Sequence, residues 1–236
     1  MDRNKNVIIT GASRGIGRAT AELFAANGYD LLICSRGEAS LYKAMEEIGI
    51  QYPSISIKAK PVDLAIKEQA IDFGHWCLNY GTPAVLVNNA GLFEPGSVYN
   101  EPEGSLESQV AVNLYSAYHL TRTVLPAMME KKQGHIFNIC SIASIAAYKN
   151  GGAYSISKYA SYGFSKNLRE EMKPHGIKVT HIIPGAAYTD SWSRSGIAAS
   201  RFMEAADIAK MIFAASQLSA GACVEEIVMR PQLGDL

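Results

Sequence analysis

The 236-residue chain is 48% hydrophobic and 19% charged, which suits one compact domain with a large core. Lys plus Arg and Asp plus Glu each number 22, and this balance argues against nucleic acid or an anionic membrane as a partner. No apolar run reaches the ~18 residues that a membrane span needs, and a strand-like run within residues 1–10 leaves no room for a signal peptide. We therefore expect a single domain over residues 1–236 that acts in the cytoplasm.

Taken in chain order, short β-rich apolar runs alternate with longer segments of helical periodicity. The predicted strands are Val7–Thr10, Leu31–Cys34, Ser56–Ala59, Ala84–Val87, His135–Cys140, Lys178–Ile183 and Cys223–Val228. The predicted helices are Arg18–Ala26, Leu41–Ile48, Lys67–Leu78, Leu106–Met129, Tyr154–Met172 and Ala205–Leu218. Strands separated by helices indicate an α/β fold, a seven-stranded parallel sheet with helices on both faces. Such sheets bind ligands at the carboxyl ends of their strands.

The turn between the first strand and the first helix is rich in glycine. Residues 10–17 read TGASRGIG, with Gly11, Gly15 and Gly17 just before the helix. Glycines permit a tight turn and a close approach to a pyrophosphate, which the helix N-terminus stabilises through its free N–H groups and its dipole. A plain tight turn would also use these glycines, but their position inside a βαβ unit favours a cofactor site. The sequence therefore predicts a Rossmann fold that binds a dinucleotide.

The end of the second strand indicates which dinucleotide binds. A fold that selects NAD places Asp or Glu there, about 20 residues after the glycines, to hold the ribose 2′-hydroxyl. Residues 33–36 read ICSR, so that Ser35 occupies the acidic position and Arg36 follows it. A guanidinium can bind a 2′-phosphate in bidentate fashion, and Arg14 in the glycine-rich turn can add a second positive charge. NADP(H) is therefore predicted rather than NAD(H).

Two Tyr–Lys pairs with the same spacing lie in the predicted helix Tyr154–Met172. Tyr154 precedes Lys158 by four residues, and Tyr162 precedes Lys166 by four. Residues four apart share one helix face, and a Lys ammonium beside a Tyr hydroxyl favours the phenolate, which suits a general acid or base. Either pair could equally be a packed ring under a lysine stem. The spacing alone leaves the choice between the pairs open.

The four cysteines and five histidines show no metal-binding pattern, because they form no CxxC, HExxH or similar cluster. We therefore predict no metal site. We interpret the cysteines as small buried apolar residues of a protein in a reducing compartment.

Several motifs in order make the chain resemble the classical short-chain dehydrogenase/reductase family over nearly its whole length. TGASRGIG corresponds to the family's cofactor loop, Asp63 in PVDLA to an acidic residue near the adenine, NNAG at residues 88–91 to a cofactor-lining motif, and PGAAYT at residues 184–189 to the segment that holds the nicotinamide end. The resemblance implies a catalytic tetrad of Asn113, Ser141, Tyr154 and Lys158. The implied cofactor-binding residues are Gly11, Ser13, Arg14, Gly15, Ile16, Gly17, Ser35, Arg36, Asp63, Leu64, Asn89, Ala90, Gly91, Tyr154, Lys158, Pro184, Gly185, Ala187 and Thr189.

The resemblance also indicates which of the two Tyr–Lys pairs is catalytic. In the family the serine precedes the tyrosine by about a dozen residues, and Ser141 lies 13 residues before Tyr154 but 21 before Tyr162. The second pair is displaced by about 12 Å along the helix, so it does not share the site. We expect Tyr162 and Lys166 to serve packing or a subunit interface.

Each member of the tetrad has an implied role. Tyr154 donates a proton to the substrate carbonyl oxygen as hydride arrives from NADPH, and Ser141 hydrogen-bonds the same oxygen. Lys158 is expected to lower the pKa of Tyr154 and, by the resemblance, to hydrogen-bond the nicotinamide ribose. Asn113, again by the resemblance, anchors a water relay to Lys158.

The segment after PGAAYT reads DSWSRSGIAASRF, and in the family this region is a lid over the substrate. Trp192 at its root could stack on a flat carbonyl compound, so the predicted substrate contacts are Ser141, Tyr154 and Trp192. Phe93, Tyr148 and Tyr188 could add aromatic surface.

Resemblances to two subfamilies imply two different substrates. YTDSW in the lid and VEEIVMRP near the end resemble bacterial sepiapterin reductase-type proteins, which reduce a side-chain diketone on a pteridine. The general pattern also resembles 3-oxoacyl-carrier-protein reductases, although the glycine pair typical of their final strand is missing. A non-catalytic NADP(H)-binding sensor is a third alternative, which the complete tetrad disfavours.

Association between copies is also expected. In the family, the helices that carry the tetrad's Asn and Tyr pack against their symmetry mates in dimers or tetramers. The same helices here carry Tyr115, Tyr118, Tyr159 and Tyr162 among small residues, more aromatic surface than a solvated helix normally shows. We expect a homodimer or homotetramer that acts on a small-molecule carbonyl substrate.

Overall fold

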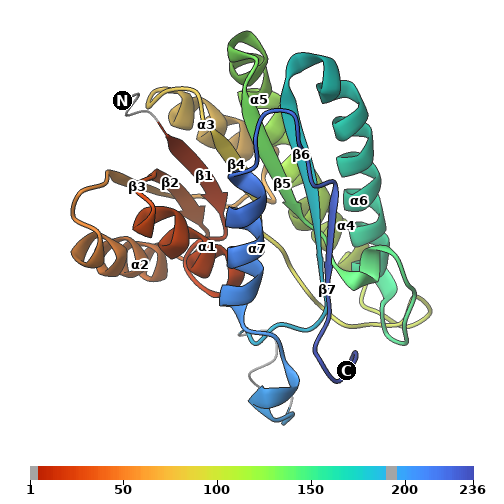
Figure 1. Cartoon of the computed structure of the whole chain (residues 1–236). Coiled ribbons are helices and arrows are strands. Elements are labelled where there is room, and N and C mark those ends of the chain that lie inside the picture. Colours follow the sequence, from red (N-terminus) through yellow and green to blue (C-terminus); the bar gives the residue numbers. More distant parts are fainter. Residues whose placement is uncertain (1–4, 190–195) are drawn as a thin grey trace.

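The protein is known from a computed structural model, which describes residues 5–189 and 196–236. One parallel sheet forms its centre, with the strand order β3-β2-β1-β4-β5-β6-β7 (Figure 1). The strands are β1 (Asn6–Thr10), β2 (Asp30–Ser35), β3 (Ile57–Pro61), β4 (Val85–Asn88), β5 (Gly134–Ile139), β6 (Ile177–Pro184) and β7 (Glu226–Met229). The α-helices are α1 (Gly15–Ala26), α2 (Glu38–Gln51), α3 (Lys67–Leu78), α4 (Ser105–Val110), α5 (Ser116–Lys131), α6 (Gly152–Met172) and α7 (Ala205–Ser216). The predicted α/β fold with a seven-stranded parallel sheet is confirmed.

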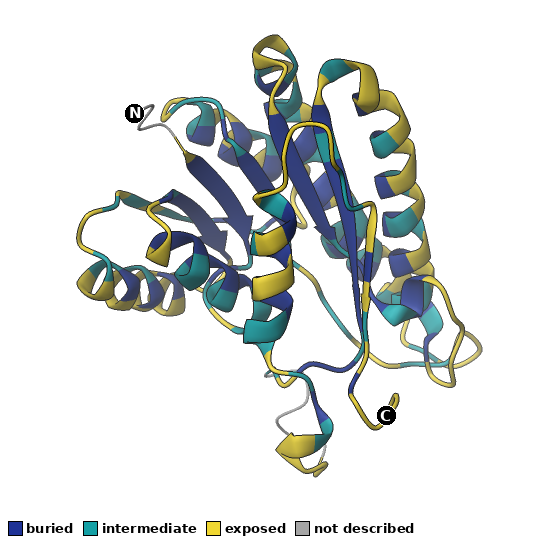
Figure 2. Cartoon of the chain, viewed as in Figure 1, coloured by how far each residue is buried: buried dark blue, intermediate teal, exposed yellow. Residues whose placement is uncertain are grey.

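Alternation along the strands builds two cores, one on each face of the sheet. In β1, Val7 and Ile9 join a cluster that contains Phe24 of α1, whereas Ile8 between them joins a cluster that contains Phe73 of α3. Helices α1, α2 and α7 therefore cover one face, and α3, α5 and α6 cover the other. Because both faces are covered, the central strands β2, β1, β4, β5 and β6 are almost wholly buried, whereas the edge strands β3 and β7 are only partly buried and the helices expose their outer sides (Figure 2).

The long helix predicted over Leu106–Met129 is interrupted. Helix α4 passes into a π-helix at Ala111–Tyr115 before α5 begins. Within this segment the main-chain carbonyl of Asn113 accepts a hydrogen bond from the Ser161 hydroxyl of α6. The residue that was predicted to belong to the tetrad therefore lies in the π-helix and is held there by a neighbouring helix.

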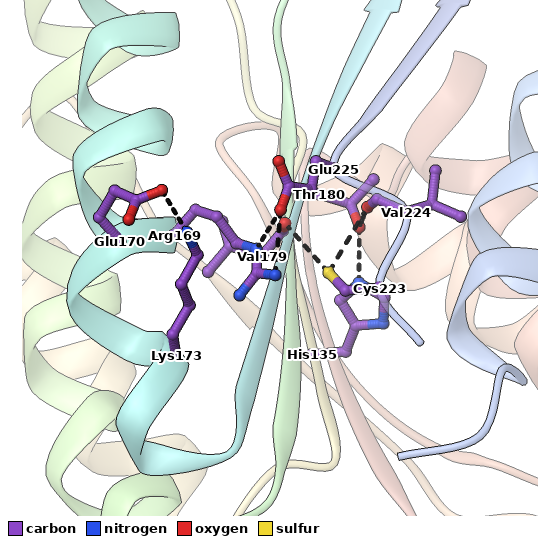
Figure 3. Close-up of polar contacts among 9 residues, drawn as sticks. All are labelled: His135, Arg169, Glu170, Lys173, Val179, Thr180, Cys223, Val224 and Glu225. Atoms are coloured by element: carbon purple, nitrogen blue, oxygen red, sulfur yellow. Dashed lines mark hydrogen bonds and ion pairs between the residues drawn. The ribbon is translucent and has the colours of Figure 1, made fainter. Parts of the chain in front are cut away.

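Strand β7 begins three residues later than predicted, because side chains hold the segment before it (Figure 3). The Thr180 hydroxyl of β6 donates to the Val224 carbonyl at 2.5 Å, and Arg169 of α6 forms an ion pair with Glu225. Since the Thr180 proton is used in this way, its oxygen accepts from Nε2–H of His135 at 2.7 Å. His135 is buried, and its Nδ1 has no hydrogen-bond partner in the described part of the chain.

Within residues 5–189 and 196–236, no helix is both long and apolar enough to cross a membrane.

Candidate active site

The glycine-rich turn lies at the carboxyl end of β1 and leads directly into α1. Gly11 and Gly15 have positive φ values of 67° and 57°, a conformation that side chains other than glycine adopt at a cost. A Cβ on Gly17 would lie 2.3 Å from the Gly11 carbonyl oxygen and 2.4 Å from Asn89 Nδ2. Backbone geometry therefore requires these glycines, and the first turn of α1, whose N–H groups have no partner within the helix, follows directly.

Two other predicted segments meet this turn. The backbone N–H groups of Asn89 and Ala90 both donate to Thr10 Oγ1 at 2.9 Å, so the NNAG motif is fixed to the end of β1. A Cβ on Gly15 would lie 3.2 Å from Thr189 Cγ2, which brings the end of PGAAYT against the same turn. Three segments far apart in sequence thus form one edge of a cleft.

The end of β2 lies beside the glycine-rich turn, since Ala12 N–H donates to the Cys34 carbonyl at 3.1 Å. Ser35 is buried, whereas Arg14 and Arg36 are both exposed at this corner. Beyond β3, the Asp63 carboxylate accepts from Ala65 N–H at 3.0 Å, and Leu64 is buried. The two arginines expected to bind a 2′-phosphate therefore stand on neighbouring loops.

The predicted catalytic groups come from β5 and α6. Ser141 lies two residues after the end of β5 and caps the short 3₁₀ turn at Ile142–Ser144, where its hydroxyl accepts from Ala143 N–H at 3.1 Å. Tyr154 lies in the first turn of α6, and Lys158 lies one turn later. The Lys158 ammonium donates to the Ile139 carbonyl at 3.0 Å and lies 5.8 Å from the centroid of the Tyr154 ring. Ser141, Tyr154 and Lys158 therefore converge, as the sequence predicts.

Burial dominates the proton affinities of these groups. It raises the pKa of Tyr154 above its ordinary value, while a hydrogen bond with Ser141 acts in the opposite direction. Burial likewise lowers the pKa of Lys158, with a smaller opposing contribution from Cys140. The net shift of the Tyr154 pKa is upward, which differs from the lowering expected from Lys158. A tyrosine with a raised pKa is a proton donor that stays protonated near neutral pH.

Asn113 holds the loop beside the site. Its side-chain amide accepts from Leu92 N–H at 2.8 Å and donates to the Leu92 carbonyl at 2.9 Å and to Ser157 Oγ at 2.8 Å. A Cβ on Gly91 would lie 3.3 Å from Asn113 Oδ1 and 3.7 Å from Lys158 Nζ. Asn113 and Lys158 therefore both lie beside Gly91, and the Asn113 side chain positions the segment after NNAG.

A cavity of about 360 Å³ joins these groups. Its lining includes the predicted residues Ile16, Asn89, Gly91, Ser141, Tyr154, Lys158, Pro184, Gly185, Ala187 and Thr189. Phe93 and Tyr148 also line it, and the Phe93 ring packs edge-on against Tyr154 with centroids 4.8 Å apart. Tyr188 is half-exposed and packs on Phe202. Trp192 lies outside the described residues.

The sequence missed several lining residues. A run of apolar residues follows Ser141 and could have indicated a pocket wall. It consists of Ile142, Ala143, Ala146 and Ala147. Others come from the last residues of the chain, namely Arg230, Asp235 and Leu236. No local pattern signals these, because they reach the cavity only through the pairing of β7 with β6.

The second Tyr–Lys pair has a different environment. The Tyr162 hydroxyl donates to Glu226 Oε1 at 2.5 Å, and Lys166 lies 3.5 Å from the same oxygen. The Tyr162 ring also packs on His181. Tyr162 is therefore half-buried between α6 and β7, where it serves packing rather than an exposed surface. No group of three or more His, Cys, Asp or Glu residues in the described chain could hold a metal ion.

Comparison with known proteins identifies the family, since the family model for short chain dehydrogenases matches residues 5–198. The chain belongs to the short-chain dehydrogenase family. It is therefore an oxidoreductase. An uncharacterized oxidoreductase of Staphylococcus saprophyticus is 29% identical over 97% of this chain and 98% of its own length. Dehydrogenase/reductase SDR family member 7B of Mus musculus is 33% identical over 80% of this chain, and the match covers 59% of that protein.

Solved structures share the fold over nearly the whole of this chain. A metagenomic short-chain oxidoreductase in complex with NADP has a TM-score of 0.84 at 28% identity and covers 97% of both chains. An alcohol dehydrogenase of the archaeon Thermococcus sibiricus, complexed with 5-hydroxy-NADP, has a TM-score of 0.88 at 26% identity with the same coverage. A short-chain dehydrogenase of Sphingobium yanoikuyae in complex with NADPH has a TM-score of 0.83 at 26% identity, and covers 97% of this chain and 88% of that one.

Proposed function

We propose that this chain is an NADP(H)-dependent reductase that converts a small carbonyl compound to an alcohol. One observation carries the proposal: Ser141, Tyr154 and Lys158 converge on a cavity that also reaches the glycine-rich turn. The glycine-rich turn fits the pyrophosphate of a dinucleotide, since Gly17 lets it close tightly against Gly11 and Asn89 directly before the N-terminus of α1.

The cofactor preference rests on charge at the end of β2. Arg14 and Arg36 are exposed there, and the position that would hold a carboxylate in an NAD-selective site is Ser35. Related proteins whose structures contain NADP or NADPH support the same preference. Asp63 and Leu64 would contact the adenine end, and Asn89, Ala90, Gly91, Pro184, Gly185, Ala187 and Thr189 would line the nicotinamide end.

NADPH, when bound, supplies hydride to the carbonyl carbon. Negative charge then develops on the carbonyl oxygen, where the Tyr154 hydroxyl delivers a proton and the Ser141 hydroxyl donates a hydrogen bond. The raised pKa of Tyr154 keeps this proton in place until it is needed. Lys158, held by the Ile139 carbonyl, orients toward the tyrosine and the ribose, and Asn113 fixes the adjoining loop.

The substrate proposed is a ketone or diketone of the kind that sepiapterin reductase-type proteins reduce. Phe93 and Tyr148 in the cavity supply the aromatic surface that a flat compound would contact, and Trp192 would add to it. A 3-oxoacyl thioester is the alternative substrate. A sensor that binds NADP(H) without turnover is disfavoured, because Tyr154 and Lys158 are both present and close together.

A screen of NADPH oxidation tests this proposal. It should include sepiapterin, 1,2-diketones and acetoacetyl thioesters, each with the wild type and with Trp192→Ala. We expect reduction of the flat and diketone substrates, weakened by the substitution because stacking contributes about 0.5–1.5 kcal/mol. A strong preference for the acetoacetyl thioester that the substitution does not change would favour the alternative substrate. Binding of NADPH without oxidation of any compound would favour the sensor.

A homo-oligomer is also proposed. A groove between α5 and α6 is lined by Tyr115, Tyr118 and Phe164, and Tyr159 beside it is 45% exposed. A second copy of the chain would cover this aromatic surface. Light scattering should give a mass that is a multiple of 25.5 kDa, and a monomer at micromolar concentration would contradict this part of the proposal.

We further propose that residues 1–236 act as one domain in the cytoplasm. The single sheet that runs through the described chain supports the first point. The four cysteines are unpaired, and three of them are buried, which supports a reducing compartment.

A further inference from the structure

The last residues of the chain return to the site after β7. Pro184 at the end of β6 pairs with Met229 at the end of β7, so Arg230 leaves the sheet at the edge where the cavity opens. The chain then turns back, since Gly234 N–H donates to the Pro231 carbonyl at 2.9 Å. Figure 1 shows this end of the chain beyond the tip of β7, at the edge to which β6 also leads. We call residues 230–236 the C-terminal segment.

The C-terminal segment is fixed against the nicotinamide side of the cleft. Gly185 N–H donates to the Met229 carbonyl at 2.7 Å. A Cβ on Gly185 would lie 3.1 Å from Pro231 Cδ and 3.3 Å from Asp235 Oδ1. The segment therefore occupies a defined position beside PGAAYT and is not a freely projecting tail.

An ion pair lies within this segment and faces the cavity. The Arg230 guanidinium binds the Asp235 carboxylate, and both residues line the cavity together with Ser141 and Tyr154. The two side chains are 41% and 39% exposed, so the pair stands where water and substrate can both reach it.

The remaining wall in this region is apolar and small. Ala143, Ala146 and Ala147 line it from one side, and Leu236 lines it from the C-terminal segment. The side chains of this wall carry no net charge as long as Arg230 and Asp235 compensate each other. A substrate carboxylate placed there would be repelled by Asp235, and it could bind Arg230 only by displacing the existing partner.

We propose that the C-terminal segment is the specificity wall of the substrate cavity. Its Arg230–Asp235 pair selects carbonyl compounds whose far end is neutral and apolar against those that carry a carboxylate. Asp235 is the specificity-determining residue, and Leu236 supplies the apolar contact. This inference rests on the proposed reduction of carbonyl compounds.

Two charge substitutions with opposite effects test the ion pair. The probes are methyl 4-acetylbenzoate and 4-acetylbenzoate, which place an ester or a carboxylate at the end of the ring remote from the ketone. Asp235→Asn should raise the ratio of kcat/KM for the acid over that for the ester about fivefold to tenfold, because Arg230 loses its partner. Arg230→Gln should lower the same ratio by a similar factor. Both effects should shrink in high salt, as Coulomb interactions at a partly exposed site do.

A matched pair of leucine variants tests the apolar contact. Leu236→Ala should lower kcat/KM for the ester about fivefold. The kcat/KM for 2,3-butanedione, which is too short to reach the wall, should change by less than about twofold. Leu233, in the same segment but 73% exposed and outside the cavity lining, provides the control, and Leu233→Ala should change neither value. NADPH affinity, measured by fluorescence titration, should be the same in all variants.

The results separate this inference from the proposed function. Equal acid-to-ester ratios in the wild type and both charge variants would overturn the inference, while reduction by the wild type would leave the proposed function standing. Wild-type protein that reduces 2,3-butanedione but neither aromatic ketone would also overturn it. Failure to reduce any carbonyl compound would overturn both.

Discussion

Replacing Tyr154 with Phe removes one hydroxyl from the centre of the candidate site and leaves the ring. The ring keeps its edge-on contact with Phe93, whose centroid lies 4.8 Å away, so the packing of the cavity is preserved. What disappears is the proton donor and its hydrogen bond with Ser141. Tyr162→Phe on the same helix is the matched control, because it removes a hydroxyl that bonds Glu226 far from the cavity.

The two substitutions should differ sharply in their effect on kcat. A positioned general acid contributes about 10²–10⁴ in rate, so Tyr154→Phe should lower kcat by at least a hundredfold. Loss of the neutral hydrogen bond of Tyr154 changes the free energy of unfolding by about 1 kcal/mol, and loss of the Tyr162 bond to the Glu226 carboxylate by about 1.5–3 kcal/mol at most, so neither variant should unfold. Tyr162→Phe loses a partly exposed hydrogen bond and should keep kcat within about twofold of the wild type.

The assay has three measurements on each variant: steady-state NADPH oxidation, NADPH affinity by fluorescence titration, and thermal unfolding. NADPH affinity should be nearly unchanged in both variants, since neither hydroxyl belongs to the glycine-rich turn. The assignment of the first Tyr–Lys pair is refuted if Tyr154→Phe retains a tenth of the activity, or if Tyr162→Phe loses as much as Tyr154→Phe.

Three further predictions concern the cofactor and stability. Arg36→Asp combined with Arg14→Ala should shift relative affinity at least tenfold from NADPH toward NADH, because each charge-assisted hydrogen bond contributes about 1.5–3 kcal/mol; wild type that binds both equally would contradict the assignment. Gly17→Ala should weaken NADPH binding tenfold or more in the same titration, since its Cβ would lie 2.3 Å from a backbone oxygen; unchanged affinity would argue against the turn as the pyrophosphate site. Burial lowers the pKa of His135 to about 3, so between pH 6.5 and pH 3 the unfolded imidazole binds a proton that the folded one does not. The wild type should lose about 2 kcal/mol of unfolding free energy from this group between pH 7 and pH 5 in urea titrations, and an equal loss in His135→Gln would show that other groups cause it.

The elements that depend on local pattern were predicted well. Helix α3 begins and ends where its periodicity predicts, at Lys67 and Leu78. The glycines of the first turn form the tight turn that was predicted, and Ser141 and Tyr154 lie together as their spacing in the sequence predicts. Backbone geometry over short stretches of chain determines both features. The roles given to the site residues stay predictions until they are measured.

What the sequence missed depends on contacts between distant segments. The π-helix at Ala111–Tyr115 follows no Gly or Pro signal in its own sequence, and the carbonyl of Asn113 within it contacts Ser161 of another helix. The upward net shift of the Tyr154 pKa depends on burial by residues from several elements. Arg230 reaches the cavity only because β7 pairs with β6 in a particular register, and neither the pairing nor the register can be read from the segment itself.

The π-helix also affects how this chain can change in evolution. A π turn contains an additional residue compared with an α turn, and such bulges arise at functional sites as single-residue insertions. Deleting one residue from Ala111–Tyr115 would replace the π turn by an α turn and shift the residues inside it, which would carry Asn113 away from Leu92. Length changes of a single codon in this segment should therefore be tolerated far less than substitutions. Because the Asn113 amide holds Leu92 through two hydrogen bonds, the length of this segment also sets the position of the loop beside the site.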